Sequence, residues 1–159
     1  MKLVVQRVAR ASVHADGELV GAIGQGMLVL LCAMAGDGPA EAERLAERLA
    51  HYRFFPDADG RMNRSALDVG AACLVVSQFT LAADGSKGRR PSFDRAADRE
   101  LARALCLCFS ERLAELGLPT SSGRFGASMP VELVNDGPVT LLLECLPRSV
   151  SAGGETSCA

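Results

Sequence analysis

The sequence is poor in the groups on which common hydrolase and metal sites depend. It has only two histidines, His14 and His51, and neither has a neighbour at metal-ligand spacing, so we expect no metal. It contains no Gly-x-Ser-x-Gly motif, no histidine at motif spacing from a nucleophile, and no carboxylates spaced as a catalytic dyad. Hydrolysis by this chain would therefore rely on backbone donors and hydroxyl groups, without a strong side-chain base or a cofactor.

Other missing features limit the class of protein and the cell compartment that we expect. The six cysteines form no Cys-x-x-Cys pair and no secretory signal opens the chain, so we expect mostly buried free thiols in a reducing cytoplasm. The longest apolar run, residues 27–35, is too short to cross a bilayer. A net charge of -2 excludes a broadly basic coat, so a nucleic-acid contact would need a local patch. The 159 residues, 48% of them hydrophobic, suffice for a single globular domain.

The patterns that are present predict an α/β fold. The continuous apolar runs at residues 27–32 and 73–76 are typical of strands buried on both faces. Asp16 and Gly17 favour a two-residue turn between two further strands. Pro39 starts the first of two main helices, and Gly117 ends the second. The expected segments are strands at residues 2–9, 11–15, 18–23, 27–32 and 73–76, and helices at residues 39–51 and 94–116.

The stretch Asn135-Asp136-Gly137-Pro138 separates two apolar runs, residues 131–134 and 139–143. Because Asn, Asp and Gly accept left-handed backbone angles or bond their own backbone, the stretch predicts a turn between the two strands of a hairpin. Pro138 removes a donor where the second strand begins, which suits a first strand residue or a sheet edge. The Gly-Pro pair also leaves two carbonyls bare, so another group can approach them closely.

A second informative stretch, Ser77-Gln78-Phe79-Thr80, follows a buried strand. Sheet proteins commonly bind ligands at strand ends, so its three hydrogen-bonding side chains indicate either a ligand site or a plain polar strand exit. Lys87, Arg89 and Arg90 place three cations within four positions on a loop that contains a glycine. On an otherwise acidic protein this cluster fits either a phosphate contact or a solvated loop.

A loop of small residues, 121–129, carries one aromatic and one thioether side chain, Phe125 and Met129. Such a loop can accept a flat base between these two side chains. The commoner use of both residue types is to fill a core. The loop alone leaves both interpretations open.

Together these stretches resemble the D-aminoacyl-tRNA deacylase family, historically called D-tyrosyl-tRNA deacylase. The resemblance covers residues 1 to about 145 in family order, and four separate motifs in sequence make it specific. The matching residues are Gln6-Arg7-Val8 with Ala11-Ser12-Val13, Gly24-Gln25-Gly26, Met62-Asn63, Val69-Gly70, Ser77-Gln78-Phe79-Thr80-Leu81, Lys87-Gly88-Arg89-Arg90-Pro91-Ser92-Phe93, Gly123-Arg124-Phe125-Gly126-Ala127 with Met129, and Asn135-Asp136-Gly137-Pro138-Val139-Thr140.

The resemblance implies a hydrolase that cleaves the ester between a D-amino acid and tRNA, and that also removes glycine mischarged on tRNA(Ala). It implies a homodimer whose protomers have a barrel-like β-sheet core with two main helices packed on it. The Gly137-Pro138 peptide, expected to be cis, would project into the pocket of the partner subunit. There its carbonyls would grip the α-amino group and leave no space for an L side chain. Arg7 would brace this motif.

The resemblance also implies roles for the other motif residues. Thr80 is a candidate nucleophile, but no base stands next to it in the sequence, so we favour a water molecule assisted by the 2′-hydroxyl of the RNA. The expected catalytic residues are Ser77, Gln78, Phe79 and Thr80. The residues expected to cradle the adenine are Phe125, Gly126 and Met129, and Ala127 is expected to bind substrate with them. Those expected on tRNA phosphates are Lys87, Arg89 and Arg90.

We therefore expect one deacylase domain at residues 1–146, followed by a disordered tail at residues 147–159. Two rival functions stay open. One is an RNA-binding module without catalysis that uses the three cations, and the other is a related proofreader that removes L-alanine from tRNA. The expected partners are D-aminoacyl-tRNA, glycyl-tRNA and a second copy of the chain, with no membrane.

Overall fold

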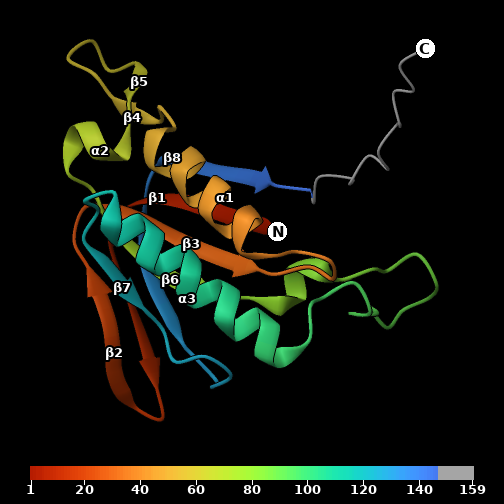
Figure 1. Ribbon diagram of the computed structural model, residues 1–159. Helices are drawn as coiled ribbons and strands as arrows, with labels where there is room; N and C mark the ends of the chain where they lie inside the picture. Colours follow the sequence, from red (N-terminus) through yellow and green to blue (C-terminus); the bar gives the residue numbers. More distant parts are fainter. Residues whose placement is uncertain (147–159) are drawn as a thin grey trace, which may run out of the picture.

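The computed structural model describes residues 1–146, and the predicted tail at residues 147–159 lies outside the described residues. The chain forms a strongly curved sheet, and two long helices, α1 and α3, lie side by side on one of its faces (Figure 1). In chain order the elements are β1 (Lys2–Ala15), β2 (Glu18–Ile23), β3 (Gly26–Cys32), α1 (Pro39–His51), β4 (Phe55–Pro56), β5 (Met62–Arg64), α2 (Ala66–Val69), β6 (Ala72–Ser77), the 3-10 helix η1 (Phe79–Ala82), α3 (Arg99–Glu115), β7 (Thr120–Ser122) and β8 (Val131–Glu144).

Strand β1 organises the sheet because it pairs with three other strands. Along one edge, β1 pairs antiparallel first with β3 and then with β2. Along its other edge, β1 pairs antiparallel with β8. Beyond β3 the sheet continues through β6 to β7, and both of these pairings are parallel. The order β2-β1-β3-β6-β7, with β8 joined to β1, gives the barrel-like α/β core that the sequence predicted.

Apolar side chains alternate between two cores on the two sides of the sheet. In β3, Met27 and Val29 enter the larger core, while Leu28 enters the smaller one. This period of two is what a strand buried on both faces requires, which confirms the expectation for residues 27–32. The larger core lies between the sheet and the two long helices and also contains Leu45, Leu49, Phe54, Leu105 and Phe109.

The two main helices were expected, and one of them starts later than predicted. Helix α1 begins at Pro39, as expected, and the Glu41 carboxylate accepts the Gly38 N–H at 3.0 Å. Helix α3 begins at Arg99 instead of Asp94, because the Asp98 carboxylate accepts the N–H groups of the next turn and so caps the helix there. Of the helices in residues 1–146, none combines the length and the apolar character that a bilayer crossing requires.

The predicted hairpin at Asn135 is wrong, because residues 131–144 form one continuous strand, β8. The pairing with β1 slips there: Gln6 lies opposite Thr140 and Val8 lies opposite Asn135. Four residues of β8 therefore face the single residue Arg7, and we call this segment, residues 136–139, the bulge. The Asn135 side chain does form local bonds, since its amide bonds both the N–H and the C=O of Val139, but these bonds close the bulge and do not reverse the chain.

The larger core predicts a contrast between two leucines of α3. Leu105 is 1% exposed and Leu107 is 59% exposed, although both lie on the same helix. We expect Leu105→Ala to lower the free energy of unfolding by about 2–5 kcal/mol, since it leaves a cavity among packed side chains. Leu107→Ala should change it by no more than about 0.5 kcal/mol. Urea denaturation of the two variants checks this, and equal losses would contradict the packing described.

Candidate functional site

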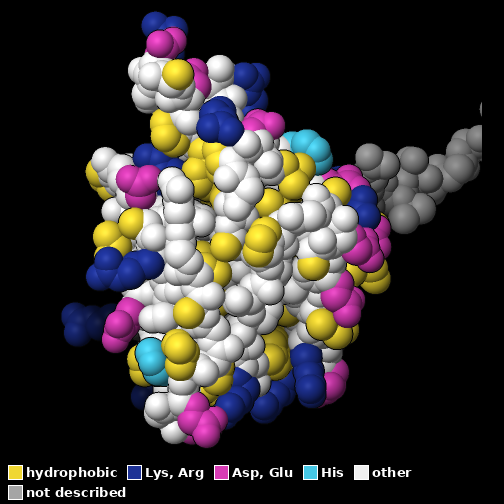
Figure 2. All heavy atoms as spheres, turned by 90° about the vertical axis from the view of Figure 1, so that its left-hand side faces the viewer, with side chains coloured by type: hydrophobic (Ala, Val, Ile, Leu, Met, Phe, Trp, Pro, Cys, Tyr) yellow, Lys and Arg dark blue, Asp and Glu magenta, His cyan; other side chains and the backbone are white. Residues whose placement is uncertain are grey.

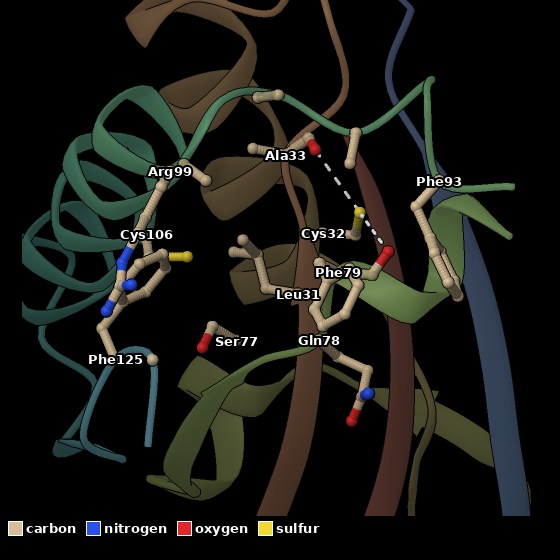
Figure 3. A pocket seen from close by; sticks show the side chains of 14 residues that line it. Leu31, Cys32, Ala33, Ser77, Gln78, Phe79, Phe93, Arg99, Cys106 and Phe125 are labelled. Atoms are coloured by element: carbon tan, nitrogen blue, oxygen red, sulfur yellow. Dashed lines mark hydrogen bonds between the residues drawn. The ribbon is translucent and has the colours of Figure 1, made fainter. Parts of the chain in front are cut away.

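A cavity of about 430 Å³ lies where β3 and β6 end. Because β3, β6 and β7 are parallel, their carboxyl ends meet at one edge of the sheet, which is where α/β proteins commonly bind ligands. The segments that follow these strands form the walls together with the start of α3 (Figure 3). The lining residues are Leu31, Cys32, Ala33, Ser77, Gln78, Phe79, Phe93, Ala96, Ala97, Arg99, Ala102, Cys106, Phe125 and Gly126.

Aromatic and very small side chains give the cavity its shape. The rings of Phe79 and Phe93 meet edge to face with centroids 5.1 Å apart, and Phe79 is 59% exposed. Ala97, just before α3, and Ala102, within it, add little bulk to the lining. A mostly apolar hollow with a few polar groups suits a flat organic ligand such as a nucleobase.

The hydroxyl and amide side chains of the cavity, Ser77 and Gln78, come from the end of β6 and the residue after it, and its arginine, Arg99, comes from α3. The Gln78 side-chain amide donates to the Thr80 hydroxyl at 2.5 Å. Within residues 1–146 the backbone N–H groups of Phe79 and Thr80 have no hydrogen-bond acceptor, whereas the Gln78 N–H donates to the Leu31 carbonyl at 2.7 Å. Two open N–H groups beside a cavity can stabilise a negatively charged oxygen, which is the requirement for ester hydrolysis without a side-chain base.

Two thiols line the cavity, and both are held in the protonated state. Burial raises the pKa of the Cys106 thiol to about 12, and burial also raises the pKa of Cys32. The Cys32 thiol contacts the carbonyl oxygens of Ala33 at 3.4 Å and Phe79 at 3.6 Å (Figure 3). Because the thiolate is the reactive form, neither cysteine is suited to act as a nucleophile near neutral pH.

The bulge is displayed on the surface, away from the cavity of its own chain. Gly137 and Pro138 are both exposed, neither lines the cavity, and the peptide bond between them is cis, as expected. Gly137 has φ +139, and a Cβ there would lie 2.7 Å from Val139 Cγ2. Arg7 lies beneath, where its Nε donates to the Asp136 carbonyl at 3.1 Å and forms an ion pair with the Asp136 carboxylate at 3.0 Å. Arg7 thus contacts the residue that precedes Gly137.

The structure brings together only some of the residues that the sequence singled out. Ser77, Gln78, Phe79, Phe125 and Gly126 line the cavity. Two other expected residues, Thr80 and Ala127, do not line the cavity but are next in sequence to residues that do. The remaining expected residues lie outside it: Met129, Arg7, Gly137, Pro138, and the exposed cations Lys87, Arg89 and Arg90.

Met129 fills a core, which was the second interpretation of its loop. It packs against the smaller core, and a Cβ at Gly123 would lie 2.7 Å from its sulfur atom. The wall from α3, including Arg99 and Cys106, was not predicted as part of a site. Its one sequence signal is the series of alanines near the start of this helix, which leaves room beside the strand ends.

Charge and metal-binding groups are sparse around the described part of the chain. Within residues 1–146 no group of three His, Cys, Asp or Glu side chains is arranged to hold a metal ion. On the face that carries β2 and β7, basic and acidic side chains are interspersed, without a broad patch of one sign (Figure 2). A polyanionic ligand would therefore be bound by a few individual cations.

Comparison with known proteins gives consistent matches over nearly the whole chain. Residues 4–144 match the family described as D-Tyr-tRNA(Tyr) deacylase. A protein of Halorhodospira halophila named D-aminoacyl-tRNA deacylase is 57% identical over 149 residues, which are 93% of this chain and 97% of that protein. A protein of Ruegeria pomeroyi with the same name is 54% identical over 144 residues, which are 91% of this chain and 99% of that protein.

Solved structures agree with the sequence matches. A structure titled c-Myc DNA Unwinding Element Binding Protein superposes with a TM-score of 0.87 at 41% identity, and the match covers 92% of this chain and all of that one. A structure titled as a probable eukaryotic D-amino acid tRNA deacylase has a TM-score of 0.75 at 15% identity, over 89% of this chain and 97% of that one. The second likeness supports the fold alone.

Proposed function

The chain belongs to the D-Tyr-tRNA(Tyr) deacylase family, and we propose that it hydrolyses the ester that joins a D-amino acid, or glycine mischarged on tRNA(Ala), to tRNA. The observation that carries this proposal is the cavity at the strand ends, which combines aromatic walls with the two open N–H groups of Phe79 and Thr80. An aminoacyl ester is already activated, so a site without a strong base is sufficient for its hydrolysis.

The terminal adenosine of the tRNA would occupy the cavity with its base beside Phe125 and Gly126. The ester would then lie near Gln78, where the open N–H groups can stabilise the negative oxygen of the tetrahedral intermediate. Thr80 has no base beside it: within residues 1–146 its hydroxyl bonds the Gln78 amide, which cannot remove a proton. The attacking group is therefore a water molecule, assisted by the 2′-hydroxyl of the RNA.

The bulge would read the chirality of the amino acid in a neighbouring subunit. Gly137 and Pro138 are exposed, lie outside the cavity of their own chain, and present carbonyl groups without bulky side chains. The rigid main chain of the bulge can accept hydrogen bonds from the α-amino group of the substrate but would clash with the Cβ of an L-amino acid. Glycine is accepted because it has no Cβ. Within residues 1–146, β8 pairs only with β1, and its exposed Leu142 favours contact with a second copy of the chain.

The direct test compares D-, L- and glycyl esters of the same tRNA. We expect release of the D-amino acid and of glycine, and rejection of the L-amino acid by at least about a hundredfold in kcat/KM, because an L side chain would meet fixed backbone. Release of free amino acid is measured by thin-layer chromatography. Binding without release would indicate an RNA-binding module, and release of L-alanine would indicate the related proofreader.

The role of Thr80 can be separated from that of the water. Thr80→Ala removes the hydroxyl but keeps the backbone N–H, so we expect kcat to fall by no more than about tenfold. Thr80→Pro removes the N–H itself, and we expect a larger loss, of about a hundredfold or more. Single-turnover rates for the two variants measure this, with circular dichroism to check folding. A loss of activity in Thr80→Ala as large as that in Thr80→Pro would support Thr80 as the nucleophile.

Subunit mixing tests whether the site is shared. One variant carries Gln78→Ala and Phe125→Ala in the cavity, and the other carries Gly137→Ala in the bulge, where a Cβ would lie 2.7 Å from Val139 Cγ2. Each homodimer should be nearly inactive. Heterodimers purified through two different tags should recover about half of the wild-type kcat, because one of their two shared sites is intact.

The outcome of the mixing experiment is unambiguous if dimers form. When each site lies within one subunit, both subunits of the heterodimer carry a defect, and no recovery is expected. Sedimentation velocity of the same samples establishes the dimer, and a monomeric wild-type protein would exclude a shared site.

A further inference from the structure

Two arginines of α3 line neighbouring cavities, and neither has a task in the site as described so far. Among residues 1–146, Arg99 is the one ionised side chain that lines the cavity at the strand ends. A second cavity, of about 220 Å³, adjoins it and likewise has one such side chain, Arg103. The two cavities share the lining residues Ser77, Cys106 and Phe125, so they lie next to each other.

The two guanidinium groups are available for an anion. Arg99 and Arg103 lie one turn apart on the same face of α3, and both are exposed. Within residues 1–146 neither has a carboxylate at ion-pair distance or donates a hydrogen bond, whereas Arg112 of the same helix binds both Glu47 and Glu115. Like charges at this spacing repel each other, and an anion bound between them would remove that repulsion.

Contact with the Phe125 loop fixes the position of Arg99. A Cβ at Gly126 would lie 2.6 Å from Arg99 Nη2 and 3.4 Å from its Cζ, so the guanidinium lies directly against this glycine. In Figure 3 the side chains of Arg99 and Phe125 lie on the same side of the cavity. The cation is thus placed at the rim beside the ring against which a base would lie.

We propose that Arg99 and Arg103 form a phosphate clamp for the phosphodiester that precedes the terminal nucleoside of the RNA. The proposal rests on the function proposed above, because it assumes that this nucleoside occupies the cavity. With its base beside Phe125, its 5′ phosphate emerges at the rim, where two guanidinium groups can donate to the phosphate oxygens. The preceding nucleoside would enter the second cavity, where Ser110 and Ser122 supply hydroxyl groups.

The test uses two esters that differ in this phosphodiester and in the cytidine that it attaches, and the arginine variants separate the contribution of the phosphodiester. One is the D-phenylalanyl ester of cytidylyl-adenosine, and the other is the D-phenylalanyl ester of adenosine. We expect the wild-type protein to prefer the dinucleotide by about ten- to a hundredfold in kcat/KM, and the Arg99→Gln, Arg103→Gln double variant to lose most of this preference. Because the readout is a ratio, it does not depend on the fraction of the variant that folds.

Arg112→Gln is the matched control, since Arg112 is on the same helix and already bonded to carboxylates. It should keep the wild-type ratio. The clamp should also make binding of the dinucleotide ester sensitive to salt, so its KM should rise with salt concentration more steeply for the wild type than for the double variant.

Each outcome separates the clamp from the deacylase. Cleavage of both esters with no preference in the wild type, or with the preference unchanged in the double variant, would overturn the clamp alone. If neither ester is cleaved, the tRNA esters of the direct test decide the proposed hydrolysis. The clamp is then tested by calorimetry, which compares the binding of cytidylyl-adenosine and of adenosine, both without an amino acid. Tighter binding of cytidylyl-adenosine that is lost in the double variant supports the clamp. Equal binding of the two by the wild type overturns it.

Discussion

The side chain of Arg7 holds the most unusual part of the backbone in place. It is only 8% exposed, and its donors reach two segments far from it in sequence: the carbonyl of Asp136 in the bulge at 3.1 Å, and the carbonyl of Phe54 at 2.7 Å. A guanidinium group so deeply buried is tolerated only when its donors are satisfied and a negative partner is near. The Asp136 carboxylate supplies that partner. The position of the bulge therefore depends on a single cation that also anchors it to the chain after α1.

The place of the cavity follows from the way in which parallel strands must be connected. Consecutive parallel strands need crossover connections, which here contain α1 between β3 and β6, and α3 between β6 and β7. Both long helices pack on one face of the sheet, so the segments that leave the strand ends turn back toward that face (Figure 1). The stretch Ser77 to Thr80 and the loop with Phe125 meet there, under the start of α3. Small side chains line the hollow near the start of α3, namely Ala96 and Ala97 before the helix and Ala102 within it.

Much of this architecture could be predicted from local patterns. Continuous apolar runs identified β3 and β6, the Asp16-Gly17 pair identified the turn before β2, and Pro39 identified the start of α1. In each case the physical signal lies within a few residues. It is burial on both faces for the two strands, a positive φ for the turn, and the missing N–H donor of proline for the start of the helix. The polar stretch at the end of β6 was identified in the same way, and three of its four residues, Ser77, Gln78 and Phe79, line the cavity.

What could not be predicted depends on contacts between distant segments. Asn135 forms the local bonds of a turn, yet pairing with β1 on both sides of the bulge keeps the strand direction unchanged, and no local pattern reports that pairing. The contribution of α3 to the cavity has the same origin, because Arg99 lies there against Gly126, a residue distant in sequence. Met129 was ambiguous for this reason as well, since only the folded loop decides between a ligand and a core.

The crowding around Gly137 limits how the sequence can vary at this position. A first side-chain carbon would lie 2.7 Å from Val139 Cγ2, 2.8 Å from the Val139 nitrogen and 3.1 Å from Arg7 Nη2. At φ +139 the backbone disfavours L residues regardless of space, so even alanine is not a conservative replacement. Every amino-acid substitution at this position is therefore expected to disturb the bulge strongly. No nearly neutral substitution is available there through which the protein could evolve a different selectivity in small steps.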